Sequence, residues 1–375
     1  MRNIYGKLFF QISVYNRRSV RVDNLATQFA AADASGDSGP YRAFAENLVC
    51  VDENEIVDRH GQRVSKIFHE ADFIVNEDSD VTVEKQVGRF VDLVFGANDI
   101  SPTRVEYGMF LAQAAALRTI DLSRQVGAAI LSPDSEIITL GSNEVPKAGG
   151  GTYWEDSKFD DREYKRKVDS NDKQKEAILN ELLDILGVRS EDIDPVKLKS
   201  ISESALMGAL EYGRIVHAEM GAISDAARLG RSVRDATLFC TTFPCHMCAK
   251  HIIASGIKDV CFLEPYPKSL AATLHGDSVQ VEGIGRGKYS NFPAVRFLHF
   301  SGITPRRYGE IFKRGKRKDE KGKFKKWKEG YARPINIIKL PFYFALENFV
   351  LRNIEASISN EALKRIVLPK SLRAD

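Results

Sequence analysis

Two short segments of this 375-residue chain carry side chains that could bind a metal ion together if folding brings the segments close. The first is His217-Ala218-Glu219 and the second is Pro244-Cys245-His246-Met247-Cys248. Between them, the run from 235 to 240 is mostly apolar, as is typical of a short buried strand. The pattern therefore predicts a helix, a strand and a helix, with potential metal ligands at the start of each helix.

The residue types in these segments match the ligand preferences of zinc. The imidazole of His217 and the thiolates of Cys245 and Cys248 supply three ligands, which leaves the fourth tetrahedral position open for water. Zinc lowers the pKa of bound water to about 7, and a helix N-terminus favours the thiolate form of cysteine. Glu219 is too close in sequence to His217 to be a comfortable further ligand, but it is suitably placed to carry a proton.

A purely structural zinc site is the alternative interpretation. Such a site requires a fourth protein ligand, and it gives Glu219 no role. The nearby His246 and His251 are expected on a helix surface, and Cys240 and Cys261 are expected to be core thiols. We therefore favour a catalytic centre with Zn2+ as its cofactor.

The order H-x-E followed by P-C-x-x-C resembles the signature of the cytidine and deoxycytidylate deaminase superfamily. Here His217, Glu219, Cys245 and Cys248 carry that signature. The resemblance implies an α/β protein with a three-layer α-β-α core. It also implies that hydroxide on zinc replaces the amine at C4 of cytosine, with Glu219 as the catalytic proton carrier.

Two further residues are candidates for substrate contacts. Asn143, in the segment 141–147, resembles the superfamily's G-x-N loop, which implies a bond to the sugar or pyrimidine of a nucleotide. An asparagine that stabilises its own turn is the alternative. The next residue is Glu144, where the superfamily commonly has glycine. Lys268, in a loop after a predicted strand, is either a phosphate contact or an ordinary surface lysine.

We expect three parts in the chain: 1–100, 101–312 and 313–375. The first part has predicted strands at 7–14 and 71–76 and an amphipathic helix at 83–95. These elements resemble the closing portion of a P-loop kinase fold. However, no G-x-x-x-x-G-K-[ST] segment is present, so this fragment lacks the phosphate cradle of a kinase.

The second part is expected to begin with a helix that Ser101 caps, with Pro102 as its first residue. Its predicted strands cover 125–131, 136–141, 235–240, 258–263 and 295–300. A helical insertion at about 155–204 includes a predicted helix from Lys173 to Leu186, which ends at Gly187. A lid, an oligomer contact and a second nucleotide site are all compatible with this insertion.

The third part opens with a basic segment at 313–328, in which Phe324 and Trp327 are interleaved. Such a segment is typical either of a site for single-stranded nucleic acid or of a solvated surface loop. We favour the solvated loop, so nucleic acid is not an expected partner. The apolar pattern from 335 to 368 is expected to pack on the core or on a partner subunit.

The composition excludes several classes of protein. A net charge of +3 is too small to indicate nucleic-acid binding by itself. No apolar run approaches the roughly 20 residues that span a bilayer, and the first residues do not begin a signal peptide. The five cysteines suggest reduced thiols. We expect a cytoplasmic protein with no membrane contact.

Three segments and the kinase-like first part resemble antiphage dCTP deaminases: 123–146, 149–154 and 266–269. This resemblance implies a homo-oligomer that converts dCTP to dUTP, or dCMP to dUMP, with release of ammonia, and that depletes dCTP in defence against phage. The alternatives are a housekeeping dCMP deaminase, a deaminase of tRNA or single-stranded DNA, and a non-catalytic nucleotide sensor. A sensor has no need of Glu219.

Overall fold

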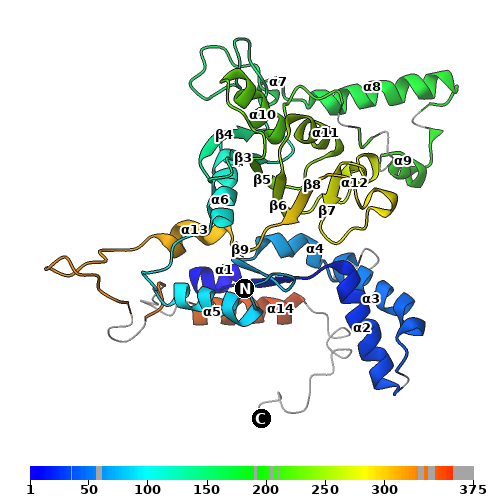
Figure 1. Cartoon of the computed structure of the whole chain (residues 1–375). Helices are drawn as coiled ribbons and strands as arrows, with labels where there is room; N and C mark the ends of the chain where they lie inside the picture. Colours follow the sequence, from blue (N-terminus) through cyan, green and yellow to red (C-terminus); the bar gives the residue numbers. More distant parts are fainter. Residues whose placement is uncertain are drawn as a thin grey trace.

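In the computed structural model, two lobes lie one above the other (Figure 1). The upper lobe contains a six-stranded sheet and the lower lobe a three-stranded sheet. The structure describes residues 1–34, 36–55, 61–189, 192–202, 204, 207–209, 211–327, 333–336 and 343–357. Among the helices in these ranges, none combines the length and the apolar character needed to cross a bilayer.

The six-stranded sheet has the order β4-β3-β5-β6-β8-β7. Strand β3 is antiparallel to both β4 and β5, whereas β5, β6, β8 and β7 run parallel to one another. Each strand predicted for this part is present, and the short β7 was not predicted. The strands are β3 (Gly127–Leu131), β4 (Ile137–Ser142), β5 (Thr237–Thr242), β6 (Asp259–Glu264), β7 (Val279–Val281) and β8 (Val295–His299).

Helices cover both faces of this sheet. Alternate residues of a strand face opposite sides, so Ala128 and Ile130 pack with α10 and α11, while Ala129 and Leu131 pack with α6. The predicted three-layer α-β-α core is therefore confirmed. Its helices are α6 (Arg104–Ala116), α10 (Ala218–Arg228), α11 (His246–Ser255) and α12 (Ala271–Leu274).

Two strand glycines allow these helices to lie close against the sheet. A Cβ on Gly127 would be 1.9 Å from the carbonyl oxygen of Ala112 in α6, and one on Gly141 would be 2.0 Å from that of Ala218 in α10. Any larger side chain would push the helix away. Gly141 therefore helps to place the first turn of α10, which carries His217 and Glu219.

The prediction for the start of α6 was wrong. The helix begins at Arg104, and its cap is Thr103 rather than Ser101. The Thr103 hydroxyl accepts the backbone N–H of Glu106, and the Glu106 carboxylate accepts the N–H of Thr103. This reciprocal capping box satisfies two backbone donors at once, so it outweighs the signal from Pro102.

The lower lobe is built around the strand order β1-β2-β9. Strands β1 and β2 are parallel, and the predicted first strand at 7–14 is shorter than expected because a 3-10 turn occupies Gly6–Leu8. Whether this lobe is a kinase relative stays a prediction. Its elements are α1 (Arg2–Tyr5), β1 (Ile12–Tyr15), α2 (Arg18–Ala32), α3 (Arg42–Asn54), α4 (Val64–Ile67), β2 (Phe73–Asn76) and α5 (Val83–Val94).

The third strand of the lower sheet comes from far along the chain. β9 (Gly302–Ile303) pairs with β2, and α13 (Pro305–Phe312) follows it. Ile303 and Ile311 pack in the same apolar cluster as Phe73 and Phe90. The last residues before the boundary predicted at 312 thus complete the core of the lower lobe.

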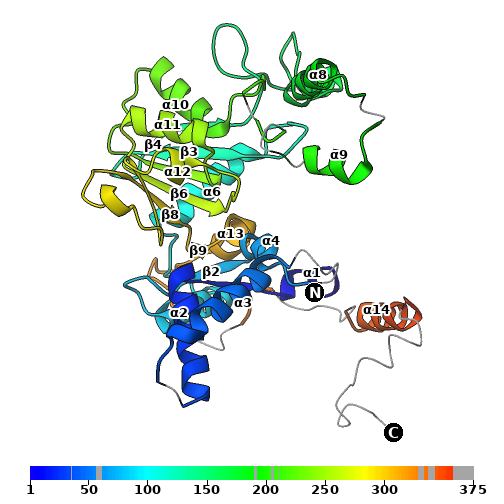
Figure 2. The same cartoon turned by 90° about the vertical axis from the view of Figure 1, so that its right-hand side faces the viewer.

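The insertion extends away from the sheet, as Figure 2 shows for α8 and α9. The predicted helix is present as α8 (Ser170–Ile185), whose cap Asp169 accepts the backbone N–H groups of Asn171 and Asp172. The other insertion helices are α7 (Glu163–Arg166) and α9 (Pro195–Ser202). Beyond the basic segment lies α14 (Tyr343–Ser357), and the predicted extension after residue 357 is outside the described residues.

Candidate metal centre and active-site cavity

His217 is the N-cap residue of α10, so its side chain lies at the positive end of the helix rather than along its flank. The preceding Val216 exchanges two backbone hydrogen bonds with Glu144, at 3.2 and 3.3 Å. This short antiparallel bridge holds the start of α10 against the loop after β4. The position of the imidazole is therefore fixed by a helix end and by a second loop.

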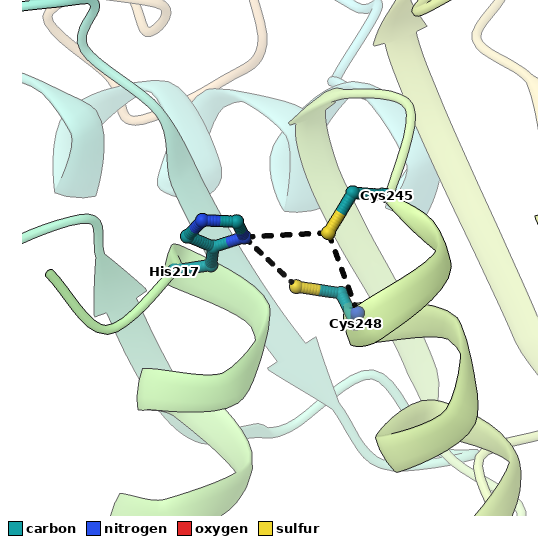
Figure 3. A group of neighbouring side chains, drawn as sticks. All are labelled: His217, Cys245 and Cys248. Atoms are coloured by element: carbon teal, nitrogen blue, oxygen red, sulfur yellow. Dashed lines mark hydrogen bonds between the residues drawn. The ribbon is translucent and has the colours of Figure 1, made fainter. Parts of the chain in front are cut away.

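The two cysteines lie at the matching end of α11. Cys245 is the N-cap residue, and its Sγ accepts the backbone N–H of Cys248 at 3.4 Å. Figure 3 shows that both sulfurs point toward the His217 ring, with each Sγ 3.4 Å from Nδ1. The three potential ligand atoms lie within 4.8 Å of one another. The predicted juxtaposition of the two segments is present.

The spacing of the three donors fits a tetrahedral metal ion. With Zn–N near 2.0 Å and Zn–S near 2.3 Å, tetrahedral angles place nitrogen and sulfur roughly 3.5 Å apart. The observed 3.4 Å between Nδ1 and each sulfur matches this separation. Within the described residues, this group of His217, Cys245 and Cys248 is the one set of three that could hold a metal.

The protonation states of these residues also suit a cation. The Cys248 thiol and the His217 ring, both hydrogen-bonded to Cys245, lower the pKa of Cys245 to about 4. The hydrogen bond with Cys245 raises the pKa of His217 to about 9. Its hydrogen bond with Cys245 also raises the pKa of the Cys248 thiol. Two thiols and an imidazole therefore share protons that a divalent metal would displace.

Glu219 lies in the first turn of α10 and is only 4% exposed. Burial raises the pKa of its carboxyl group, and this effect outweighs the nearby charge of His217, which lowers the pKa. A buried carboxyl group with a raised pKa can both accept and return a proton near neutral pH. Glu219 lines the same cavity as His217 and Cys245, as its predicted role requires.

The cavity has a volume of about 290 Å³. Its walls come from the loop before β3, the ends of β4, β5 and β6, and the insertion. The lining residues are Asp121, Ser123, Arg124, Val126, Asn143, Glu163, Asp169, Asn171, Asp172, Lys175, Gly213, Arg214, Ile215, His217, Ala218, Glu219, Thr242, Phe243, Cys245 and Tyr266. The insertion thus forms one wall of the site.

Asn143 lines the cavity but already uses its side chain within the protein. Its Oδ1 accepts the backbone N–H of Val126 at 2.7 Å, and its Nδ2 donates to Asp121 Oδ2 at 2.6 Å and to the Arg124 carbonyl at 2.7 Å. These bonds hold the loop from 121 to 126, rather than the asparagine's own turn. A direct contact between Asn143 and a substrate stays a prediction.

Lys268 is exposed and is not among the cavity residues. Three other cations line the cavity: Arg124, Lys175 and Arg214. Arg124 lies in a segment that already resembles deaminases, so that resemblance could have drawn attention to it. Nothing in the sequence marks Lys175, because its place depends on how the insertion folds back.

A buried ion pair attaches the insertion to the catalytic core. Arg162 is 2% exposed; it donates to both carboxylate oxygens of Asp160 at 2.9 Å, and its Nη1 is 3.7 Å from Glu144 Oε2. Arg162 also holds the pKa of Asp160 well below its usual range. Nearby, the Arg118 guanidinium lies 3.6 Å from the centre of the Trp154 ring. Glu144, which departs from the common glycine, is thus a buried partner of the insertion.

Comparison with known proteins agrees with this geometry. The family model for the cytidine and deoxycytidylate deaminase zinc-binding region matches residues 102–264. Deoxycytidylate deaminase of Enterobacteria phage T2 is 48% identical over 54 residues, or 14% of this chain and 29% of that protein. The chain therefore spans less than a third of that phage relative. Deoxycytidylate deaminase of Mus musculus is 27% identical over 202 residues, covering 54% of this chain and 88% of the mouse protein.

Among solved structures, the apo dCMP deaminase of cyanophage S-TIM5 matches with 17% identity and a TM-score of 0.28. The match covers 53% of this chain and 100% of the cyanophage chain. The matched region 102–264 includes both metal-ligand segments and the six-stranded sheet as far as β6. Residues 102–264 of this chain therefore match the zinc-binding region of the cytidine and deoxycytidylate deaminases.

Proposed function

We propose that this protein is a hydrolase that removes the 4-amino group of a cytosine deoxynucleotide. One observation carries the proposal: the buried carboxyl of Glu219 lies in the same cavity as a His-Cys-Cys group whose spacing fits zinc. The names of the relatives, deoxycytidylate deaminases of a phage and a mammal, support a cytosine deoxynucleotide as the substrate.

Each residue of the site then has a defined task. His217, Cys245 and Cys248 would hold Zn2+, which supplies hydroxide at neutral pH. Glu219 takes a proton from water, passes one to N3 or to the leaving amine, and so allows C4 to gain oxygen as ammonia departs. The carbon–nitrogen bond breaks, a carbon–oxygen bond forms, and the cytosine ring becomes uracil without oxidation or reduction.

The rest of the cavity suits a small nucleotide. Phe243, Tyr266 and Val126 supply apolar surface for a pyrimidine ring, and Arg124 is a candidate phosphate contact. Arg124 has a half-exposed side chain, and its one salt-bridge partner among the described residues, Glu264 at 2.5 Å, is also solvent-accessible. The exposed Lys268 is less well placed for this role.

The wall formed by the insertion argues against a polynucleotide. Residues of the insertion such as Glu163, Asp169 and Asp172 close one side of the cavity, and a tRNA or DNA strand that continued past the target base on that side would meet this wall. A housekeeping dCMP deaminase remains the second candidate, because the relatives carry that activity in their names. We favour dCTP, and a role in depleting it during phage infection, because of the segments that resemble antiphage dCTP deaminases.

We also propose that the protein is a cytoplasmic homo-oligomer. Exposed apolar side chains on edge strand β4 and in the segment after α6 support subunit contact: Ile137, Leu140, Leu117, Ile120 and Leu122. Light scattering of the purified protein would test this part of the proposal. A monomer at micromolar concentration would contradict it.

A substrate panel tests the function. The zinc-loaded protein is incubated separately with dCTP, dCMP, CTP and a cytosine-containing DNA oligonucleotide, and each product is separated by chromatography. We expect dUTP as the main product, with the Glu219→Ala variant as the inactive control. Turnover of dCMP alone would support the second candidate, and turnover of the oligonucleotide alone would contradict the proposal.

A further inference from the structure

A second cavity, of about 470 Å³, lies in the lower lobe and is separate from the metal centre. Its lining residues come from the ends of β1 and β2 and from the facing sides of α2 and α3: Val14, Asn16, Arg21, Asn24, Leu25, Leu48, Val49, Asp52 and Glu77. Since β1 and β2 are parallel, their carboxyl ends meet at one edge, where open α/β sheets bind ligands. Helices α2 and α3 lie side by side over this end of the lobe (Figure 1 and Figure 2).

Two polar atoms of the cavity residues lack partners. Among the described residues, neither Asn16 Oδ1 nor Arg21 Nε has a hydrogen-bond partner, although both atoms are shielded from solvent. A buried polar atom without a partner destabilises the folded chain, and a ligand that bonded to it would recover this loss. Asn16 Oδ1 accepts a hydrogen bond and Arg21 Nε donates one, so the ligand should offer both a donor and an acceptor.

The surrounding charges exclude a phosphorylated ligand. Arg21 and Arg18 are both paired with Glu53, at 2.5 and 3.4 Å, and Arg17 is paired with Asp78 at 3.0 Å. The carboxylates of Asp52 and Glu77 line the cavity and would repel phosphate. Apolar walls come from Val14, Leu25, Leu48 and Val49. A flat, uncharged heterocycle with a polar edge fits this combination.

A line of aromatic side chains leads from this cavity to the metal centre. Tyr15 lies between the lining residues Val14 and Asn16, so its ring faces the opposite side of β1 and stacks on His299 at 4.6 Å. His299 packs edge-on against Phe262 at 5.3 Å, and Phe262 does the same against Phe243 at 4.8 Å. Phe243 lines the active-site cavity, directly before Pro244-Cys245.

We propose that the lower cavity binds an uncharged nucleobase or nucleoside, and that its occupancy alters deamination through the rings of Tyr15, His299, Phe262 and Phe243. The second half of this statement rests on the proposed function. The first half does not, because binding can be measured whatever the enzyme's substrate. A shift of Tyr15 on filling the cavity would move the His299 ring and, through Phe262, the wall of the active site.

The binding experiment uses calorimetry on the full-length protein with adenosine, guanosine and thymidine, and with their 5′-monophosphates. Nucleosides without cytosine are chosen because cytidine would enter the active site. We expect saturable binding of at least one nucleoside with one site per chain, and at least about tenfold weaker binding of its monophosphate. No saturable binding, or tighter binding of the monophosphate, would overturn the proposal.

Two arginines that share one partner provide matched variants. Arg21→Ala removes a lining residue and should weaken binding at least about tenfold, whereas Arg18→Ala removes the other partner of Glu53 and should change it less than about twofold. Asn16→Leu, of similar volume, is a second test in case the first variant unfolds. Equal effects of the two arginine variants would place the ligand elsewhere.

The coupling experiment measures deamination with and without saturating nucleoside. We expect at least about a twofold change in kcat or KM in the wild-type protein and none in Tyr15→Leu, which keeps the lining residues and should still bind. Binding without a change in rate in the wild type would refute the coupling.

Discussion

Arg162 and Glu144 are both 2% exposed, and their charged groups approach to 3.7 Å where the insertion meets the loop after β4. Asp160 completes the group from the insertion side, with two hydrogen bonds to the same guanidinium. The segment that forms one wall of the active site is thus attached to the core by buried charge, next to Asn143 and the bridge that positions His217.

Removal of Arg162 should destabilise the protein strongly. Arg162→Ala leaves the buried carboxylate of Glu144 and the partly buried carboxylate of Asp160 without their cation, which typically costs about 3–5 kcal/mol. Urea unfolding measures this loss. Arg166→Ala is the control, because Arg166 forms an exposed pair with Asp161 and should change stability by less than about 1 kcal/mol. Equal losses of stability in the two variants would show that the buried ion pair stabilises the protein no more than the exposed one does.

Substitution of Arg124 should affect phosphorylated substrates selectively. Arg124→Ala should raise KM for the nucleotide about tenfold or more and leave deamination of deoxycytidine nearly unchanged, because a charge-assisted hydrogen bond to phosphate is lost. Steady-state kinetics on both substrates gives the comparison. Lys268→Ala is the matched surface control, and a larger KM effect in that variant would restore the phosphate role predicted for Lys268.

Stability should fall in mild acid because of His299. Burial lowers the pKa of His299 to about 4, from 6.5 in an unfolded chain. Since the unfolded chain takes up the proton first, this contribution to stability is complete above pH 6.5 and is lost between pH 6.5 and 4. About 2 kcal/mol of the loss falls between pH 7.5 and 5. Urea unfolding at pH 7.5 and 5 should show the loss in the wild type. His299→Phe should reduce it, and an unchanged pH dependence in this variant would assign the loss to other groups.

The metal centre could be predicted from the sequence because its parts are local. The spacing in His217-Ala218-Glu219 and in Cys245 to Cys248 places each set on one helix start. The two starts come together because β4 and β5 are both antiparallel to β3, so that their carboxyl ends lie at the same edge of the sheet. The strands of the upper sheet other than the three-residue β7 were predictable for the same reason, since each is a short, mostly apolar run.

The remaining features depend on contacts between distant segments. Gly302–Ile303 is too short to be predicted as a strand, and it forms one only because β2 offers a free edge. The roles of Lys175 and Arg162 depend on where the insertion packs, and no local pattern encodes that. The role of Lys268 stays a prediction, because a position after a strand does not specify which way an exposed loop turns.

The most direct test of the account is turnover of dCTP by Glu219→Gln protein whose zinc content has been measured alongside the wild type. Because Gln keeps the shape of the side chain but cannot accept a proton, we expect about one zinc per chain in both proteins and a loss of at least about 10²-fold in kcat for the variant. Full zinc occupancy with an unchanged kcat would contradict Glu219 as the proton carrier, and with it the proposed mechanism.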